Sequence, residues 1–514
     1  MFAASENGAL PGGKVGGVAD VIHDLPIALT TKGWHATIVT PAYGMFHKLE
    51  GAERLGTINV SFRGQDHAVE VYEVPGNNSP VQNIVLEHPL FSPHGPGQIY
   101  CGDPPHEPFA TDANKFAFFG AALAAWLWAL PQPPHALHLH DWHTGFYFLL
   151  REFDPAYAEL KDIHTVFSIH NLFYQGIRPL AGPDSSLERW FPGMRVDISW
   201  IRDPRYPDCF NAMATAIRMA EVVSTVSPTY AKEICRPSDH FHGFFGGEGL
   251  EGDLNWLDGQ GRLVGILNGC EYPEKTGSRP GWPEVVQLMR EQVGEWLLQG
   301  SHNDIHELAA ERLASLGEER PRHVMVSIGR LVGQKVSLFL RAMPDGRSAL
   351  EHMLEDLGEQ DILLLLGSGE PGLEQHMLEV ARRSPNLVFL RGYSEQLADP
   401  LYRTGDLFLM PSSFEPCGIS QMLAMRVGVP CVVHGVGGLR DTVEHGVTGF
   451  VFDGTNPVEQ SMDFVATVEN ALKFKDSDSA GWNKMCLAAV AKRFDWDESA
   501  QRTIETLYDA KSQA

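Results

Sequence analysis

The feature that most constrains the fold is an alternation of short apolar segments with helical patterns, which runs through both halves of the chain. In the second half, helical stretches such as GLEQHMLEVARRS separate the apolar segments HVMVSIG, DILLLLG, NLVFL and DLFLMPS. Strands that are apolar throughout are typical of parallel sheets covered by helices on both faces. The sequence therefore predicts an α/β protein whose ligands bind beyond the carboxyl ends of its strands.

The length of the chain predicts more than one domain, because single cores rarely grow beyond about 250–300 residues. At 514 residues the chain is expected to form two such α/β domains that face each other across a cleft. The segment 271–320 fits the rhythm least well, since it begins with proline and glycine and then turns polar and helical. We expect its start to be a linker and its helices to open the second domain.

Charge and composition exclude several classes of function. The formal net charge of −25 argues against partners such as nucleic acid or an anionic membrane surface. The 7 cysteines are scattered and never spaced CxxC, which fits a reducing cytoplasm without a structural zinc. No signal peptide is predicted, and the most apolar stretch, 116–130, is shorter than the roughly 20 residues of a membrane span. We therefore expect a buried helix there and a cytoplasmic protein.

Two glycine pairs flank one lysine in PGGKVGGVAD, residues 11–20, directly before a predicted helix. Glycines let the backbone approach a ligand closely, and a helix N-terminus offers unpaired N–H groups. The stretch predicts either an anion site with Lys14 as its charge or a surface turn that happens to contain a lysine.

Two predicted strands end in polar side chains. HLHDWH, residues 138–143, ends one of them, and SIHN, with His170 and Asn171, ends the other. A single histidine at a strand end is usually a cap, whereas two such strands side by side favour a binding site. A dinuclear metal site would need its aspartate one position later than Asp141. We therefore favour a polar cluster that binds a hydroxylated ligand over a metal centre.

The loop GRLVGQK, residues 329–335, follows an apolar strand and carries Arg330 and Lys335. Both cations could reach one diphosphate, the arginine through two parallel hydrogen bonds and the lysine as a point charge. Two solvated surface cations are the alternative interpretation. Downstream, SSFEPCG places Glu415 beside a helix start, and VGGLRD, residues 436–441, offers a second glycine-rich helix start suited to phosphate.

The motif GSGEPG, residues 367–372, satisfies the GxGxxG pattern of dinucleotide-binding proteins. That interpretation also requires an acidic residue at the end of the next strand, where this chain has Arg391 instead. The motif therefore predicts a tight turn from strand to helix near a ligand, and hydride transfer is disfavoured.

Read in order along the chain, these motifs resemble the bacterial glycogen synthase and plant starch synthase family. The motifs that carry the resemblance are KVGG, HLHDWH, SIHNLFYQG, VSPTYAKEI, ILNG, GRLVGQK, FEPCGISQ and GGLRDTV. The resemblance implies a GT-B fold of two Rossmann-like domains, with residues 1–268 on the acceptor side and 269–514 on the donor side. The last helix is a candidate to pack back on the first domain.

The resemblance also implies a chemistry. The enzyme would be a retaining hexosyltransferase that needs neither a metal nor another cofactor. Its donor would be ADP-glucose, and its acceptor the non-reducing end of an α-1,4-glucan such as glycogen, starch or a maltooligosaccharide. Whether retention proceeds by same-face attack or through a covalent intermediate stays open.

Individual roles follow from the resemblance, position by position. Arg330 and Lys335 would neutralise the donor diphosphate, and Glu415 would bind the hydroxyls of the transferred glucose. His170 would face the anomeric centre, and Lys14 would reach the distal phosphate when the domains close. The other expected donor-binding residues are Gly17, Asn268, Tyr393 (stacked on the adenine), Cys417, Gly418 and Ile419. The expected acceptor-binding residues are Glu6, Asp141, Trp142, His143 and Asn171.

The chain departs from the family pattern at four places. These are a short first strand, Glu271 in place of the usual aspartate, HGV at 434–436, and the region 272–312. Two alternative functions remain: a related GT-B transferase that uses UDP-glucose or another acceptor, and a catalytically silent glucan-binding homologue. All five expected catalytic residues are present, which argues against the silent homologue; they are Lys14, His170, Arg330, Lys335 and Glu415.

Overall fold

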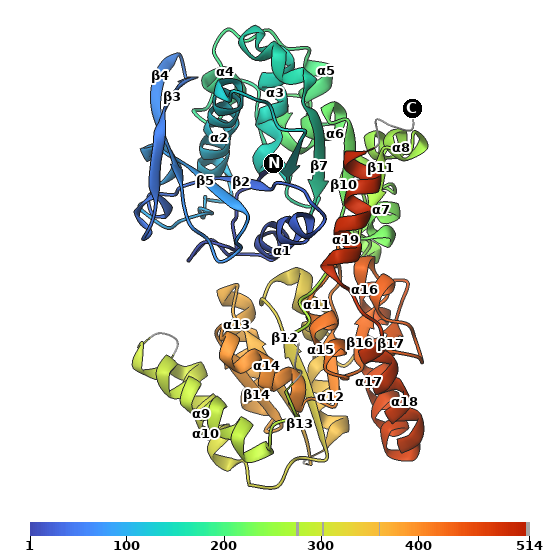
Figure 1. The fold of residues 1–514 in the computed structure, drawn as a ribbon. Coiled ribbons are helices and arrows are strands. Elements are labelled where there is room, and N and C mark those ends of the chain that lie inside the picture. Colours follow the sequence, from blue (N-terminus) through green and yellow to red (C-terminus); the bar gives the residue numbers. More distant parts are fainter. Residues whose placement is uncertain (274–276, 301–302, 359, 510–514) are drawn as a thin grey trace. The chain divides into compact units, whose positions relative to one another are not determined.

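The computed structural model describes residues 1–273, 277–300, 303–358 and 360–509. The chain divides into two compact units (Figure 1). Unit 1 comprises Met1–Ser238, Gly246–Gly269 and the residues from Trp496 onward, and unit 2 comprises Asp239–Phe245 and Cys270–Asp495. Both units are Rossmann-like α/β folds built on largely parallel sheets, as the alternation of apolar strands and helices predicts. Within the described ranges, no helix is long and apolar enough to cross a membrane.

Unit 1 is organised around a sheet with the order β11-β10-β7-β6-β1-β2-β5-β4-β3. From β11 to β5 neighbouring strands run parallel, whereas β4 is antiparallel to both β5 and β3. The strands are β1 (Phe2–Ala3), β2 (Thr37–Pro41), β3 (Glu53–Phe62), β4 (Gln65–Glu73), β5 (Gln82–Glu87), β6 (Ala136–His140), β7 (His164–Ile169), β10 (Val222–Thr225) and β11 (Leu263–Gly265). A separate antiparallel pair is formed by β8 (Ile177–Pro179) and β9 (Cys209–Asn211).

The β3–β4 edge differs from the parallel pattern that the sequence predicts. Arg63 and Gly64 connect the two strands, and their φ angles are 54° and 70°. Positive φ at both central residues is the geometry of a two-residue hairpin turn whose twist matches that of the flanking strands. The chain therefore turns straight back as an antiparallel strand instead of crossing over through a helix.

Apolar faces of the helices close the core of unit 1. The predicted buried helix is α2, in which every residue from Lys115 to Leu127 is buried. The face of α1 that carries Ile22 and Leu25 packs with β1 and β2, and Trp496 and Tyr508 near the end of the chain join the same cluster. The helices of unit 1 are α1 (Gly17–Thr31), α2 (Ala110–Ala129), α3 (Gly145–Phe153), α4 (Leu187–Trp190), α5 (Ile198–Ile201), α6 (Ala212–Met219), α7 (Pro228–Glu233), α8 (Glu251–Gly259) and α19 (Trp496–Thr503), which continues as a π-helix (Ile504–Tyr508).

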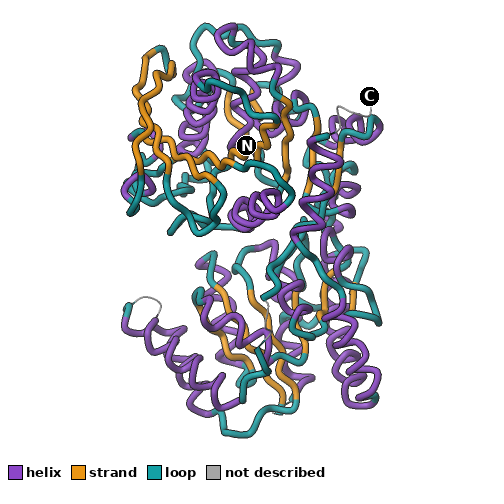
Figure 2. Tube along the Cα trace, in the orientation of Figure 1, coloured by secondary structure: helices purple, strands orange, loops and turns teal. Residues whose placement is uncertain are grey.

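Unit 2 contains a sheet in which every neighbouring pair is parallel, in the order β14-β13-β12-β15-β16-β17. Its strands are β12 (His323–Ile328), β13 (Asp361–Gly367), β14 (Leu387–Arg391), β15 (Leu407–Met410), β16 (Cys431–His434) and β17 (Gly449–Phe452). Helices alternate with these strands along the chain (Figure 2). They are α11 (Gly333–Leu340), α12 (Ala349–Leu357), α13 (Pro371–Arg383), α14 (Glu395–Thr404), α15 (Ser420–Arg426), α16 (Gly437–Thr442), α17 (Pro457–Ser477) and α18 (Ser479–Ala491).

The segment 271–320 supplies two further helices to unit 2, α9 (Trp282–Leu298) and α10 (Asn303–Ser315). The first packs on α14 and the second on β14, and the rings of Trp296 and His306 stack with their centroids 5.6 Å apart. Residues 274–276 of the expected linker and residues 301–302 lie outside the described residues.

Candidate active site

The adjacent strands β6 and β7 bring HLHDWH and SIHN together at one edge of the unit 1 sheet. The Nδ1 atom of His140 lies 2.8 Å from Nε2 of His170. The ring of His138 stacks on that of His140 with their centroids 4.4 Å apart, and the ring of Phe2 in β1 stacks on both. The short first strand therefore supplies an aromatic wall for the histidines.

Burial keeps these imidazoles neutral. It holds the pKa of His138, His140 and His143 well below the usual range and lowers the pKa of His170 to about 4. Both ring nitrogens of His138 are used, since Nδ1 lies 2.9 Å from the Tyr508 hydroxyl and Nε2 lies 2.6 Å from Oγ of Ser168. Its role is therefore to tie the turn Ile504–Tyr508 to the sheet.

Asp141 has a strained backbone, with φ at 55° and ψ at 177°. Residues other than glycine adopt this region only where their surroundings impose it, and such strain clusters at functional sites. Its Oδ1 accepts hydrogen bonds from the backbone N–H groups of His170 (2.8 Å) and Asn171 (3.4 Å). Burial raises the pKa of Asp141 to about 7, although these hydrogen bonds oppose the shift. Asp141 thus fixes the loop that carries His170.

Trp142 and His143 pack inside unit 1. Their exposed fractions are 3% and 7%. A Cβ at Gly176 would lie 2.1 Å from the Trp142 ring, so glycine is required where the chain crosses the indole, at a φ of 65°. The ring of His143 lies against those of Phe116 and Tyr100, at centroid distances of 4.6 Å and 5.3 Å. Trp142 and His143, both expected to bind the acceptor, are therefore held by packing within unit 1.

The lysine-containing loop before α1 is held from within unit 1. Glu6 is buried, and its Oε2 accepts hydrogen bonds from the backbone N–H groups of Val15 (2.8 Å) and Gly16 (2.7 Å). The Nζ atom of Lys14 lies 2.7 Å from Oδ1 of Asp20, in the first turn of α1. The glycine-rich sequence predicts that N–H groups near the helix start bind a ligand. In the structure, two N–H groups beside the helix start donate to Glu6 instead.

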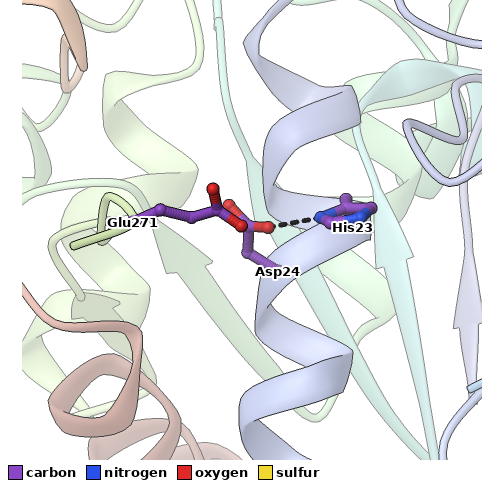
Figure 3. A group of neighbouring side chains, drawn as sticks. All are labelled: His23, Asp24 and Glu271. Carbon is purple, nitrogen blue, oxygen red and sulfur yellow. Dashed lines mark hydrogen bonds and ion pairs between the residues drawn. The ribbon is translucent and has the colours of Figure 1, made fainter. Parts of the chain in front are cut away.

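One turn further along α1, His23 hydrogen-bonds Asp24 (Figure 3). The other ring nitrogen of His23 lies 3.1 Å from Oδ1 of Asn77, in the loop before β5. His23 therefore connects α1 to the loop before β5.

In unit 2, the loops after β12 and β15 bring the expected diphosphate and sugar residues together. Lys335 forms an ion pair with Glu415, whose exposed fraction is 5%, and the Ser412 hydroxyl donates to the same carboxylate over 3.1 Å. A cavity of about 30 Å³ beside this pair is lined by Arg330, Lys335 and Ser412, among others. The site therefore holds two cations and one buried carboxylate at the carboxyl edge of a parallel sheet.

Two glycine-rich loops meet beside Glu415. A Cβ at Gly437 would lie 2.0 Å from the carbonyl oxygen of Glu415, and a Cβ at Gly438 would lie 2.3 Å from that of Cys417. Gly418 and Gly437 also have positive φ angles of 77° and 42°. Only glycine allows the FEPCG and GGLRD segments to approach this closely.

The remaining expected donor-binding residues are spread over both units. Tyr393 follows β14, its side chain is 66% exposed, and its hydroxyl donates to Glu395 over 2.8 Å. Ile419 precedes α15. Gly17 and Asn268 lie in unit 1, the first exposed at the start of α1 and the second half-buried after β11.

The predicted turn GSGEPG is confirmed, because β13 ends at Gly367 and α13 begins at Pro371. Side chains at Gly367 or Gly369 would collide with the backbone of Gly329 or Leu331. The glycines of this motif thus make room for the loop that carries Arg330.

Comparison with known proteins decides the family. A model of the starch synthase catalytic domain matches residues 1–256, and a model of glycosyl transferases group 1 matches residues 322–472. A glycogen synthase from Anaeromyxobacter sp. is 34% identical, covering 99% of this chain and 98% of its own. One from Gloeobacter violaceus is 33% identical, covering 98% and 96%. The chain belongs to the glycogen and starch synthase family.

Solved structures agree with this assignment to the glycogen and starch synthase family. The catalytic domain of starch synthase IV from Arabidopsis thaliana, bound to ADP and acarbose, matches with a TM-score of 0.76 and 26% identity. The match covers 100% of this chain and 99% of that one. A sucrose-phosphate synthase from Thermosynechococcus elongatus matches with a TM-score of 0.55 and 16% identity over 100% and 99%, which shows a shared fold alone. The protein is a GT-B glycosyltransferase with glycogen or starch synthase function.

Several residues that contact the site of this synthase lie outside the sequence motifs. Phe2 stacks on the histidines, Tyr508 binds His138, and the Tyr100 hydroxyl lies 2.8 Å from Oε1 of Glu6. Tyr508 is separated from His138 by 370 positions, and Tyr100 from Glu6 by 94. A single sequence contains no signal for contacts at such separations.

Proposed function

We propose that the protein transfers glucose from ADP-glucose to the non-reducing end of an α-1,4-glucan, with retention of configuration. The observation that carries the proposal is the cluster of Arg330, Lys335 and Glu415 beside one cavity in unit 2. Two cations match a diphosphate, and a buried carboxylate matches sugar hydroxyls, which it accepts as hydrogen-bond donors. The Arabidopsis starch synthase IV structure with ADP and acarbose supports an adenine nucleotide and a glucan-like acceptor.

In this reaction the bond between the anomeric carbon and the diphosphate oxygen breaks, and ADP leaves with the electron pair. The oxygen of an acceptor hydroxyl forms the new bond to the anomeric carbon, and its proton is released with ADP. Negative charge grows on the diphosphate while positive charge grows on the sugar. Arg330 and Lys335 neutralise the first, and the carboxylate of Glu415 orients the sugar through its hydroxyls. Charges that are already in place before the reaction stabilise it most, because they need not reorient as it proceeds.

In unit 1, the neutral imidazole of His170 is held by His140 through its ring and by Asp141 through its backbone. We assign this histidine to the side of the reacting sugar carbon. A neutral ring can exchange hydrogen bonds with sugar hydroxyls without adding a charge. Lys14, which is ion-paired with Asp20, supplies a third cation for the donor phosphates.

We further propose that the reaction needs no divalent metal and takes place in the cytoplasm. Arg330 and Lys335 supply the countercharge that a metal would otherwise provide. None of the 7 cysteines, all of which lie in the described ranges, forms a disulfide, which suits a reducing compartment.

The deciding experiment incubates the protein with ADP-glucose or UDP-glucose, each with glycogen or maltooligosaccharides, and follows nucleotide release and chain extension. Extension with ADP-glucose, undiminished by EDTA, is the expected result. Preference for UDP-glucose would favour the related transferase. Glucan binding without nucleotide release in any combination would favour the silent homologue. Complete loss of turnover in EDTA, restored by one metal, would contradict the metal-free mechanism.

A further inference from the structure

A fully buried ion pair lies inside α2, next to Phe116, whose ring packs against His143. The Nζ atom of Lys115 lies 2.8 Å from Oδ1 of Asp112, and their side chains are 0% and 4% exposed. Rings of Tyr43 and Phe116 lie 5.6 Å and 5.1 Å from the ammonium. A buried ion pair contributes little net stability compared with apolar residues of the same volume, because both charges lose their hydration. Its presence in an otherwise apolar helix therefore requires another explanation.

The pair forms hydrogen bonds with the backbone of the segment that precedes α2. Lys115 donates to the carbonyl oxygen of Ile99 over 2.5 Å. Asp112 accepts from the backbone N–H of Cys101 with both oxygens, over 3.1 Å and 3.2 Å. Tyr100 lies between these two attachment points, so the ion pair fixes the backbone on both sides of it.

Tyr100 passes this constraint to the lysine loop. Its hydroxyl lies 2.8 Å from Oε1 of Glu6 and 2.9 Å from Oγ of Ser5. The other oxygen of Glu6 holds the N–H groups of Val15 and Gly16. Burial keeps the pKa of Tyr100 well above its usual value, so the hydroxyl remains a donor. Hydrogen bonds on either side of Tyr100, joined through that residue itself, thus connect the ion pair with the residues that follow Lys14.

We propose that Asp112, Lys115 and Tyr100 are positioning residues for Lys14. They hold Glu6 in place, and Glu6 fixes the backbone of Val15 and Gly16, which follow Lys14 in the loop. The inference rests on the proposed function only for the role of Lys14. The hydrogen bonds that hold the loop do not depend on what the lysine binds.

Hydrogen exchange tests directly whether these hydrogen bonds hold the loop. The N–H groups of Val15 and Gly16 are protected by Glu6, so Tyr100→Phe should raise exchange in a peptide covering residues 9–20 by about tenfold. Tyr206→Phe is the matched control, because Tyr206 lies in unit 1 but its side chain is 56% exposed. Unchanged exchange in Tyr100→Phe would overturn the proposal.

A second variant tests the ion pair without leaving a buried charge unpaired. The double substitution Asp112→Leu with Lys115→Met replaces both charges by apolar groups, a change that buried pairs often tolerate. It should fold and should show the same increase in exchange at residues 9–20. Normal protection of the loop in this folded double variant would remove the ion pair from the proposal.

Kinetic measurements test whether Tyr100 acts on turnover through Lys14. Tyr100→Phe should lower kcat by about tenfold while the KM for ADP-glucose changes less than about threefold. In a Lys14→Ala background, Tyr100→Phe should have no further effect on kcat, because both act through the same group. Independent effects on kcat would overturn the link to Lys14. A wild-type protein without glucosyl transfer would contradict the proposed function, while the exchange data would still decide whether the network holds the loop.

Discussion

Lys335 and Glu415 form an ion pair across the carboxyl ends of two neighbouring strands of unit 2. Lys335 follows β12, Glu415 follows β15, and the two strands are hydrogen-bonded to each other. The residue expected to bind phosphate thus forms an ion pair with the residue expected to bind the sugar. On the proposed function, a diphosphate bound to Lys335 would compete with Glu415 for the ammonium group and would free the carboxylate for sugar hydroxyls.

Arg330 and Lys335 should each have a large effect on kcat/KM. Arg330→Ala and Lys335→Ala are each expected to lower kcat/KM by about a hundredfold or more, because each removes a preorganised stabiliser of the leaving diphosphate. Arg347→Ala is the control, since Arg347 is exposed in unit 2 and pairs with Asp345. Steady-state rates of ADP release measure the effect. Near wild-type rates in both variants would move the diphosphate site elsewhere.

Asp141 should make stability fall as pH rises. Its pKa is about 7 in the folded protein and about 3.9 in an unfolded chain, so between these values only the folded state keeps the proton. Stability is therefore lost as pH rises from about 4 to about 7. Asp141→Asn keeps both backbone hydrogen bonds and cannot ionise.

Urea unfolding at several pH values measures this difference. The free energy of unfolding of Asp141→Asn relative to wild type should grow by about 1–4 kcal/mol across the window. The buried histidines have lowered pKa values and give the opposite slope, because the unfolded state binds their protons first. That slope is common to both proteins and cancels in the difference. Parallel curves for the two proteins would contradict the prediction.

The pair of His140 and His170 should have a defined tautomer. Among the described residues, Nε2 of His140 has no hydrogen-bond partner. Orphaned buried N–H groups are rare, so we expect this nitrogen to be the unprotonated one. His140 then donates from Nδ1 to Nε2 of His170, and His170 carries its own proton on Nδ1.

Nitrogen NMR of histidine-labelled protein measures this tautomer. His164 is an internal reference, because its Nε2 must donate to the carbonyl oxygen of Leu507, 2.7 Å away. In His140→Phe the donor to His170 is gone, and the His170 signals should shift toward a mixture of tautomers. A proton on Nε2 of His170 in the wild-type protein would reverse the assignment.

Tyr508 should stabilise unit 1 through its hydroxyl. Tyr508→Phe removes the partner of the His138 Nδ1 atom and should lower the free energy of unfolding by about 1–2 kcal/mol. Tyr206→Phe, at an exposed ring, should leave it unchanged. Urea denaturation of the three proteins gives the comparison. Equal stability of wild type and Tyr508→Phe would show that His138 finds another partner.

Local patterns were sufficient to predict the two α/β units. The strand Leu407–Met410, which is apolar throughout, is buried in a parallel sheet, as its composition requires. The antiparallel edge was missed, because it depends on the backbone angles of Arg63 and Gly64 and not on the strands themselves. The closing of the unit 1 core by Trp496 and Tyr508 depends on contacts between the two ends of the chain.

The site was predictable where its residues follow strands. Lys335 and Glu415 are brought together because β12 and β15 are neighbours, and His170 meets His140 because β6 and β7 are neighbours. Tyr100 was missed because no pattern marks its loop. The acceptor role of Glu6 stays a prediction, and the structure adds contacts with the lysine loop that spacing along the chain does not reveal.

The return of α19 to unit 1 imposes an order on how the protein is made. Residues from Cys270 to Asp495, the bulk of unit 2, emerge from the ribosome before Trp496 can cover the apolar face of α1 and the strands beneath it. At about 5–20 residues per second this delay is about 10–45 s. Unit 2 is therefore the part of the nascent chain that can complete its core first, and unit 1, although synthesised earlier, is finished last.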